Sequence, residues 1–571
     1  RSLRFNKDDN HHLDRTPSAD GNRKIWTFSC WYKLCKFNAT DKCNFLSAGA
    51  AGDGDTMQLT LRDVSNSHGI GFTRVGQGHL MIIGNKNTYE KRFRDRNSWY
   101  HIVWSCNTTA STSGERLKAY VNGTLVTMGN LSWGQSSDTY INYSNYKHTI
   151  GNFSYDTGAE LDGYLAEVNF VDGQELDPTE FGYTESQTGI WRPKKYITKK
   201  INNGTTWSSN VTTSNLYGGN LADVFDGDPL DSATINSTDA SNNHLTLSSV
   251  NVVASKVTVW VSNSGSDIQV YINGSLVGTV SSGDMTDNVS KPFSFTFTET
   301  TVSTIKVQRG GSTSGWIIYG INLNDVMLID GDTSNVGVNG YHLDFKDNSS
   351  TTTLGKDTSG RGNDWTLSNF SVSAGVGNDS VIDTPTNNFA TLNTSYLTGG
   401  GGTTSNGNLD FTGDSNYSTR AANFSVKIGK WYWEGTPTST PSPSAPQAFG
   451  IVRGTDVGGN TYIGYDPNGN VAGFGYFNGG SIKGSLPDGS TSGTNLTTGQ
   501  TTYTINDVVG LASDIENGTL SFYKNGTLVY TITGIGSHDW FPAQATYSTG
   551  GKNSVNFGQR PFAYTPPTGY K

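Results

Sequence analysis

One short pattern occurs three times in this chain: a strand end with an aromatic residue, the dipeptide Asn-Gly, and an aliphatic pair. The copies lie at 119–126, 270–277 and 522–529. Asn-Gly accepts a positive φ at both central positions of a type I′ turn, so each copy predicts a tight β-hairpin. Asn122, Asn273 and Asn525 stand 151 and 252 residues apart, far beyond the period of a solenoid or a propeller. The pattern therefore predicts separate β domains built on similar hairpins.

The composition favours strands and turns over helices. Glycine accounts for 70 of the 571 residues. Ser, Thr and Asn are abundant, whereas helix-favouring runs of Ala, Leu, Glu and Lys are almost absent. Aromatic residues make up 11% of the chain, which argues against a disordered polypeptide. The length allows roughly three to four domains. We therefore expect an all-β chain of tandem β-sandwiches, or jelly rolls, with almost no helix.

Charge and hydropathy argue against two classes of partner. With a net charge of −9, the chain lacks the basic face that nucleic-acid binding requires. No apolar run approaches the roughly 20 residues that span a bilayer, so we expect no membrane insertion. The chain does not start with Met, and residues 1–6 already have the pattern of a strand. We expect it to be a processed polypeptide or part of a longer one.

The four cysteines, Cys30, Cys35, Cys43 and Cys106, fall in the first quarter of the chain. Their spacings fit no zinc ribbon or finger. Cys30 and Cys106 are predicted core thiols on neighbouring strands. Cys35 and Cys43 flank a short polar turn, where they either pair or remain free. Four cysteines allow three pairings, and the sequence does not choose among them.

Residues 1–198 alternate apolar and polar positions in many short runs. The run 160–171 leads into 176–182, which predicts a strand, a turn and one helical turn. This segment resembles the closing motif of laminin-G/concanavalin-like jelly rolls, in which Asp-Gly-x-Leu-x-Glu-Val precedes a short Leu-x-x-x-x-Phe turn. The opening 3–6 and the central 99–103 fit the same family. The resemblance implies a jelly roll over 1–198.

Residues 199–334 have a different sequence pattern. The stretch 220–228, Asn-Leu-Ala-Asp-Val-Phe-Asp-Gly-Asp, resembles the Ala-x-x-x-Asp-Gly-Asp loop of discoidin-like, galactose-binding sandwiches. The Thr-x-Trp that usually follows is replaced by Asp-Ser-Ala-Thr at 231–234. The flanking stretches 191–196 and 338–345 resemble adjoining parts of one phage-type structural sequence. We therefore expect residues 199–334 to be an inserted β-sandwich.

The remainder is predicted to be a connector followed by a final domain. Residues 335–398 contain Asp-Thr-Ser-Gly-Arg-Gly-Asn at 357–363, which resembles a turn near the start of laminin-G-like sandwiches. The segment is too short for a domain, so we expect a connector that packs on its neighbours. Residues 399–571 carry in order Gly-Lys-Trp-Tyr-Trp-Glu, Asp-Val-Val-Gly-Leu and the third Asn-Gly hairpin, a series that resembles a SPRY domain. A Pro/Ser/Thr-rich loop at 437–446 departs from that family's compact turn.

One run of carboxylates raises the question of catalysis. Retaining glycosidases of concanavalin-like fold use Glu-x-Asp-x-Glu on one strand face, with carboxylates about 5 Å apart. Glu160 and Asp162 begin such a run, but Glu167 lies seven residues from Glu160 and so faces the other side of the strand. No Gly-x-Ser-x-Gly elbow, His-x-x-x-His pair or Walker loop occurs. We therefore expect no catalytic residue and no enzyme activity.

Asp226 and Asp228 flank a glycine in a predicted loop. Two carboxylates so placed suit a hard, oxygen-preferring cation, and in the discoidin-like family this loop often carries a structural calcium ion. The alternative is an acidic turn in which the Asp side chains accept hydrogen bonds from backbone N–H groups. The sequence leaves both open, and Ca²⁺ is the one cofactor that it suggests.

Carbohydrate sites combine aromatic faces with a few polar groups, although most aromatic rings of a β-sandwich belong to its core. The candidates for ligand binding are Trp316 in the inserted domain and Tyr465, Tyr476 and Phe477 in the final domain. The run 474–480 is the strongest candidate, because its glycines predict a turn that holds rings near the surface.

The order of jelly roll, inserted sandwich, connector and SPRY resembles tail-fibre and virion structural proteins of bacteriophages. The resemblance implies a receptor-binding protein on the virion surface, a homotrimer in a fibre. It would bind host-cell surface carbohydrate or protein through its loops and contact other virion proteins. Weak sites of similar type would act together through effective concentration. Two alternatives remain open: a structural head or tail decoration protein with protein–protein contacts, and a polysaccharide depolymerase.

Overall fold

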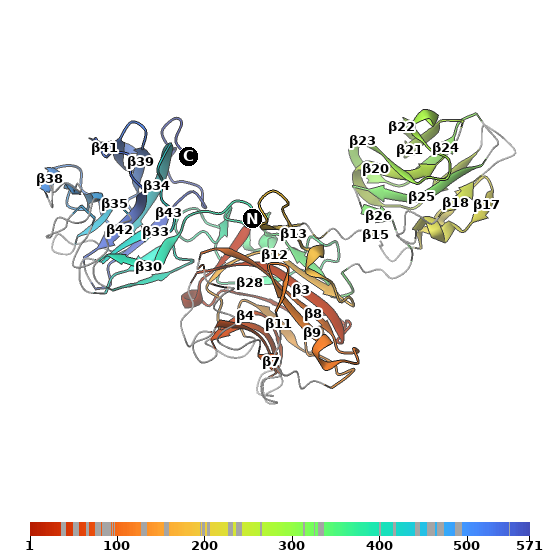
Figure 1. Cartoon of the computed structure of the whole chain (residues 1–571), viewed down its shortest axis with the longest axis horizontal. Helices are drawn as coiled ribbons and strands as arrows, with labels where there is room; N and C mark the ends of the chain where they lie inside the picture. Colours follow the sequence, from red (N-terminus) through yellow and green to blue (C-terminus); the bar gives the residue numbers. More distant parts are fainter. Residues whose placement is uncertain are drawn as a thin grey trace. The chain divides into compact units, whose positions relative to one another are not determined.

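The computed structural model of the chain consists almost wholly of antiparallel β-sheets (Figure 1). It describes residues 1–35, 42–49, 56–63, 68–74, 81–82, 93, 95, 97–126, 134–153, 159–194, 196, 200–201, 206–225, 232–235, 243–262, 265–311, 315–324, 326–328, 330, 336–398, 401–414, 418–439, 446–453, 463–464, 473–485, 494–547 and 549–571. The chain divides into two compact units, Arg1–Lys195 with Asn339–Lys571, and Tyr196–Val338.

The prediction of tandem β-sandwiches with almost no helix is confirmed. Within the described ranges, the α-helical content is a single turn, α2 (Thr351–Leu354), besides short 3₁₀ turns. Ser350 caps this turn, because its hydroxyl accepts a hydrogen bond from the Thr353 backbone N–H. No helix in the described part of the chain is long and apolar enough to cross a membrane.

The first sandwich of the larger unit consists of two stacked sheets. One sheet runs in the order β10 (Thr124–Val126), β9 (Leu117–Val121), β8 (Trp99–Asn107), β3 (Ile25–Leu34), β12 (Gly163–Asp172), β1 (Ser2–Phe5) and β29 (Ser380–Val381), with β27 (Tyr341–Leu343) paired to β12. The other runs β28 (Thr366–Ser368), β2 (His12–Arg15), β11 (Lys147–Ile150), β4 (Lys42–Gly49), β5 (Thr56–Asp63), β6 (His68–Arg74) and β7 (Met81–Ile82). We call this the N-terminal sandwich.

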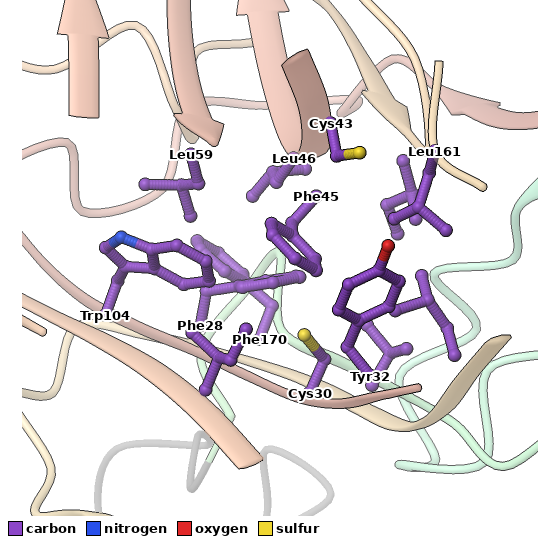
Figure 2. Packing of buried hydrophobic residues seen from close by; sticks show 14 of the residues in the cluster. Phe28, Cys30, Tyr32, Cys43, Phe45, Leu46, Leu59, Trp104, Leu161 and Phe170 are labelled. Atoms are coloured by element: carbon purple, nitrogen blue, oxygen red, sulfur yellow. The ribbon is translucent and has the colours of Figure 1, made fainter. Parts of the chain in front are cut away.

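Alternation along β3 explains the stacking of these two sheets. Trp26, Phe28 and Cys30 occupy alternate positions and lie in the core. In Figure 2, Phe28 and Cys30 lie together with Phe45 of β4 and Trp104 of β8. Burying one aromatic side chain of this size contributes roughly 2–3 kcal/mol. The period-two pattern of the sequence thus selects the core face of this sheet.

Most of the stretch 335–398, expected to be a connector, contributes strands and core to the N-terminal sandwich, whereas its last strand, Leu392–Thr398, belongs to the C-terminal sandwich. β27 pairs with β12, β28 with β2, and β29 with β1. Tyr341 and Trp365 lie in the same core as Phe170, and the Tyr341 ring stacks on Phe170 at 5.6 Å. The first jelly roll is therefore built from two pieces of sequence on either side of the insertion.

A small hairpin covers the outer face of the β8–β3 sheet. It consists of β13 (Gly182–Thr184) and β14 (Trp191–Pro193). The Trp191 ring stacks on His101 with centroids 6.0 Å apart, and His101 stacks on Trp31 at 5.0 Å. The Trp191 indole N–H donates to Nδ1 of His101 at 3.0 Å. These three rings close that face to solvent, and His101 is fully buried.

The second unit is a sandwich with its own core. One sheet runs β15 (Lys200–Ile201), β26 (Val326–Leu328), β25 (Trp316–Leu323), β18 (Ala233–Ile235) and β17 (Leu216–Gly219), with β20 (Val252–Ser262) between β25 and β23 (Lys291–Val302). The other runs β16 (Val211–Thr213), β19 (His244–Leu247), β24 (Ile305–Arg309), β21 (Ile268–Ile272) and β22 (Ser275–Val280). Trp207 and Trp316 are among its core residues.

The C-terminal sandwich, residues 391–571, again stacks two sheets. One runs β30 (Leu392–Thr398), β33 (Ser418–Ala422), β42 (Trp540–Thr546), β35 (Gln447–Arg453), β36 (Gly473–Phe477), β37 (Ile482–Ser485) and β38 (Thr494–Thr497). The other runs β31 (Thr403–Ser405), β32 (Asp410–Thr412), β43 (Lys552–Asn556), β34 (Lys430–Pro437), β39 (Val509–Asp514), β40 (Thr519–Lys524) and β41 (Thr527–Thr533). Trp433, Phe449 and Trp540 lie in its core.

The three Asn-Gly hairpins form as predicted. They join β9 to β10, β21 to β22, and β40 to β41. Asn122, Asn273 and Asn525 have φ values of 48°, 48° and 47°, and the glycines that follow have 75°, 82° and 79°. Two consecutive positive φ values define the type I′ turn. In each sheet the hairpin supplies the last strand, so the three turns lie at sheet edges.

All four cysteines are buried free thiols. Cys30, Cys43 and Cys106 belong to the core of the N-terminal sandwich, whereas Cys35 lies with Tyr164 and Val381 in a separate cluster. The open question of a pair between Cys35 and Cys43 is thus answered in favour of unpaired thiols. Burial raises the pKa of the Cys30 and Cys35 thiols, so both stay protonated and unreactive at neutral pH.

Candidate functional site

Five chain segments meet at one end of the C-terminal sandwich. β33 ends beside the start of β42, and β34 begins beside the end of β43, as the pairs Ala421–Ala543 and Glu434–Asn556 show. The residues before β30 complete the ring. A cavity of about 850 Å³ opens here, and we call it the aromatic groove. It is lined by Asn387, Asn388, Phe389, Ala390, Asn423, Phe424, Ser425, Val426, Trp431, Tyr432, Trp433, Phe541, Pro542, Phe557, Gly558, Phe562 and Lys571.

Two of the rings in this groove remain open to solvent. Trp431 and Trp433 lie on the same side of β34 because they are two residues apart, yet Trp433 is in the core while Trp431 is 38% exposed. β43 pairs with β34 only from Glu434 onward, so Trp431 lies beyond the end of that neighbouring strand. Phe424, directly after β33, is 42% exposed. The end of the sandwich therefore presents aromatic surface that neither sheet covers.

Contacts with the Ile428 carbonyl and with the C-terminal stretch of the chain hold this aromatic surface in place. The Trp431 indole N–H donates to the Ile428 carbonyl at 2.7 Å. The Tyr432 ring meets Phe562 edge-on, with centroids 4.9 Å apart, and the Tyr432 backbone N–H donates to the Lys571 carbonyl at 2.8 Å. A site fixed before binding loses less conformational entropy when a ligand arrives.

Glu434 anchors the same terminal stretch from beneath. Its carboxylate accepts hydrogen bonds from the backbone N–H groups of Ala563 and Tyr564 at 2.8 and 3.0 Å. Burial raises the pKa of Glu434, and these two backbone donors together with the Tyr432 hydroxyl counteract only part of the rise. The carboxylate is a buried structural acceptor, and its role is to position the wall of the groove.

The opposite wall of the groove is a segment anchored by a buried ion pair. We call 384–390 the strap. Lys33 Nζ lies 2.6 Å from the carboxylate of Asp383, and both side chains are fully buried. The same ammonium donates to Oδ1 of Asn388 at 2.8 Å and to the Phe389 carbonyl at 2.9 Å. Trp99 Nε1 donates to the other Asp383 oxygen at 2.9 Å. Lys33 therefore holds the strap at Asn388 and Phe389 and pairs with Asp383, the residue that precedes it.

Asparagine side chains provide polar groups along the rim. The Asn423 side-chain carbonyl accepts from the Thr391 backbone N–H at 2.9 Å, and that of Asn388 accepts from Lys33. Among the residues that the structure describes, the amide N–H₂ groups of Asn388 and Asn423 have no partner, so they can donate to a ligand. Exposed rings next to amide donors form the combination that sugar hydroxyls and C–H faces require.

The aromatic residues proposed from the sequence occupy other positions. Trp316 is 1% exposed in the core of the second unit, where its indole N–H donates to Asn243. Tyr476 and Phe477 are 0% and 3% exposed. The turn after β36 does form, but it holds these two rings against the sheets, because strand alternation sends them to its two covered faces. The expectation of rings near the surface is therefore wrong for Tyr476 and Phe477, and Trp316 is buried as well.

Three other proposed residues lie outside the described ranges: Tyr465, Asp226 and Asp228. The calcium site at Asp226 and Asp228 stays a prediction. In the part of the chain that is described, no group of three or more His, Cys, Asp and Glu side chains could hold a metal ion. Calorimetric titration with calcium tests the prediction, and no heat together with no gain in melting temperature would contradict it.

The carboxylates considered for catalysis do not form a common face. Glu160 and Asp162 precede β12 and are buried. Glu167 lies within β12 at a bulge, with a φ of 48°, and its carboxylate bonds to His342 at 2.9 Å. The absence of enzyme activity stays a prediction.

Sequence reasoning missed the aromatic groove, although one signal for it was present. The run Trp431-Tyr432-Trp433 is visible in the chain, and two tryptophans at alternate positions face the same side of a strand. Which of them extends past the core depends on where β43 ends. That limit comes from pairing across more than a hundred residues, and the local pattern does not contain it.

Comparisons with known proteins connect part of the chain to a family. Residues 8–180 match the model of the concanavalin A-like lectin/glucanases superfamily. The SPRY domain of human HERC1 is 17% identical, with 30% of this chain and 99% of that chain covered and a TM-score of 0.24. A second human SPRY domain is 14% identical, with 26% and 92% covered and a TM-score of 0.20. No curated protein sequence matches. The family match confirms the concanavalin-like resemblance of the N-terminal sandwich.

Proposed function

We propose that this chain is an adhesion protein on the surface of a bacteriophage particle and that it binds host surface glycan in the aromatic groove. A concanavalin-like, lectin-type domain in the chain makes binding the function class to test first. The single observation that supports the glycan ligand is the pair of exposed rings, Trp431 and Phe424, beside the amides of Asn388 and Asn423. The cavity volume of about 850 Å³ lies in the range of roughly 300–1,000 Å³ typical of small-ligand sites.

A glycan array probed with the full chain tests the ligand class. We expect binding by the unmodified chain and at least a tenfold loss with Trp431→Ala, because a central aromatic anchor carries much of the binding energy. Leu528→Ala is the matched control, since Leu528 is an exposed apolar residue of β41 at 55% exposure outside the groove. Equal binding by Trp431→Ala and the unmodified chain would contradict the groove as the site.

The particle location has its own test. Antibody raised against this chain and viewed by electron microscopy should decorate intact particles, and no label on intact particles would exclude a surface location. A fibre protein of this kind would act as a homotrimer, which light scattering on the purified chain measures. Weak sites repeated in a trimer would gain avidity through effective concentration.

A structural decoration protein is the second candidate. Ile428 beside the groove is 69% exposed, and an apolar edge of this kind also suits a peptide of another virion protein. A blank glycan array, no adsorption to host cells and binding to purified virion proteins would favour this candidate over adhesion. A reducing-sugar release assay on host polysaccharide separates either from a depolymerase.

A further inference from the structure

A second cavity adjoins the other end of the strap, on the N-terminal sandwich. Its volume is about 320 Å³, enough to hold one sugar ring. We call it the cationic pocket. It is lined by Arg1, Ala166, Glu167, Pro193, Lys194, His342, Lys346, Thr384, Pro385 and Thr386. The cationic pocket shares no lining residue with the aromatic groove, so its function is considered separately.

A β-bulge in β12 places the only acidic side chain of the pocket lining. The register of β12 against β3 shifts between Ala166 and Asn169, and Glu167 within this shift has a φ of 48°. A left-handed backbone is unfavourable for a glutamate by about 1 kcal/mol. Bulges re-aim side chains and occur often beside functional sites. The strained backbone at Glu167 is an observation independent of the cavity, and Glu167 lines the cationic pocket.

His342 is the hydrogen-bond partner of Glu167. The His342 Nε2 atom lies 2.9 Å from one carboxylate oxygen, and Nδ1 lies 3.0 Å from the Thr358 hydroxyl. The hydrogen bond and charge of His342 outweigh burial and lower the pKa of Glu167, so its carboxylate is ionised at neutral pH. The second carboxylate oxygen has no partner among the described residues and can accept a hydroxyl proton.

The cations of the pocket are only partly paired. Lys346 Nζ lies 3.1 Å from the Asp344 carboxylate. Lys194 Nζ donates at 2.9 Å to the neutral Thr179 carbonyl, and neither Lys194 nor Arg1 has an ion pair among the described residues. Glu167 is bonded to His342, and Asp344 is paired with Lys346. The charges of Arg1 and Lys194 therefore remain to bind a ligand.

We infer that the cationic pocket binds a monosaccharide unit that carries one carboxylate. The ligand carboxylate would pair with Arg1 and Lys194, because a guanidinium and an ammonium both bind carboxylates by charge-assisted hydrogen bonds. Its hydroxyls would donate to the second oxygen of Glu167 and bond to Thr384 and Thr386. A doubly charged phosphate fits less well, since Glu167 would repel it. This site is separate from the aromatic groove and does not depend on the proposed function.

Binding of glucuronate to the purified chain, followed by calorimetry or ligand-observed NMR at low ionic strength, tests the inference. We expect saturable glucuronate binding, at least tenfold tighter than that of glucose, which has the same ring without the charge. Lys194→Ala should weaken glucuronate binding at least fivefold. Lys552→Ala is the matched control, because Lys552 is an exposed lysine of β43, and it should leave binding unchanged. Inorganic sulfate and phosphate complete the series of probes.

A second variant keeps the test independent of folding. Glu167→Gln retains hydrogen bonding to His342 but removes one negative charge, so it should tighten sulfate binding while reducing the preference for glucuronate over sulfate. Equal binding of glucuronate, sulfate and phosphate by the unmodified chain would overturn the inference in favour of a non-specific anion site. So would equal glucuronate binding by Lys194→Ala and Lys552→Ala. Trp431→Ala should not change glucuronate binding. The proposals for the cationic pocket and for the aromatic groove are therefore tested independently.

Discussion

The N-terminal and C-terminal sandwiches treat their surplus aromatic residues in opposite ways. In the N-terminal sandwich, Trp31 and His101 lie on the outer face of a sheet, and the β13–β14 hairpin places Trp191 over them. In the C-terminal sandwich, Trp431 and Phe424 lie at the end of the stack and are 38% and 42% exposed. An aromatic ring beyond the core is thus either covered and stabilising or open and available to a ligand. The same residue type is thus covered by a hairpin in one sandwich and partly exposed to solvent in the other.

The two sandwiches also differ in their histidines. The N-terminal sandwich buries His101 and His148, whereas the C-terminal sandwich has one histidine in its sequence, His538. His101 Nδ1 accepts from Trp191 while Nε2 bonds to the Ser29 hydroxyl. His148 Nε2 accepts from the Asn142 backbone N–H. A ring nitrogen that accepts carries no proton, so each imidazole is held neutral.

The largest expected effect comes from removing the charge that anchors the strap. Lys33→Met leaves the Asp383 carboxylate buried without its cation, which should cost about 3–5 kcal/mol of unfolding free energy. Chemical denaturation measures the loss. The double variant Lys33→Met with Asp383→Asn removes both charges and retains the acceptor for Trp99, so it should recover much of that loss. Lys24→Met, at a lysine with 42% exposure, is the control. A loss below about 1 kcal/mol for Lys33→Met would show that the Lys33–Asp383 ion pair does not anchor the strap.

Mild acid should destabilise the N-terminal sandwich specifically. Burial lowers the pKa of His101 and His148 to about 3, below the ordinary value near 6.5 in the unfolded chain. The unfolded state therefore binds more protons, and stability falls as pH drops below about 6.5, by about 2 kcal/mol per histidine at pH 5. Glu434 acts in the opposite direction, because its raised pKa makes the folded state the better proton acceptor.

Thermal melts at pH 7 and pH 5 measure this effect. His148→Gln can keep an acceptor for Asn142 and a donor for the Tyr146 carbonyl but does not titrate. We expect its melting temperature to fall less between the two pH values than that of the unmodified chain. An equal fall for both proteins would assign the acid sensitivity to the carboxylates instead.

Truncating the two tryptophans directly compares the covered and the open rings. Trp191→Ala should cost about 2 kcal/mol, because it uncovers His101 and leaves the His101 Nδ1 acceptor unpaired. Trp431→Ala should cost less than about 1 kcal/mol, since its ring is already partly in water. Denaturation of both variants under one condition gives the comparison. A larger loss for Trp431→Ala than for Trp191→Ala would contradict the prediction that the covered ring contributes more to stability than the open ring.

Substitution of the three hairpin glycines separates backbone strain from side-chain contact. An alanine at position 274 meets open space, so Gly274→Ala should cost about 1 kcal/mol, from its positive φ of 82° alone. The Cβ of Gly123→Ala would lie 2.5 Å from the Trp191 ring, and that of Gly526→Ala 2.6 Å from the Tyr564 ring. Both should therefore cost more than Gly274→Ala in the same denaturation assay. Equal losses at all three positions would mean that the neighbouring rings move away freely.

Local patterns predicted the fold class but not the pairing of distant segments. The Asn-Gly turns and the alternation in β3 follow from backbone and solvation rules that act over a few residues. Such rules do not predict the role of the stretch 335–398, because its strand β29 pairs with β1, which lies before the insertion in the sequence. The expectation that the rings of Tyr476 and Phe477 lie near the surface was wrong for the same reason. A Gly-rich run predicted the turn after Tyr476, but burial of that ring depends on Tyr503 and Phe522, which pack against it from other strands.

The sequence by itself determined an all-β chain, the three type I′ hairpins and the concanavalin-like character of its first part, because each depends on neighbouring residues and the period of a strand. Only the tertiary structure decided which rings are covered. Trp31 and Trp431 each precede a tyrosine within a strand. One lies beneath a hairpin closed by Trp191, whereas the other lies past the end of β43. Burial depends on where distant strands end, and that is set by long-range pairing.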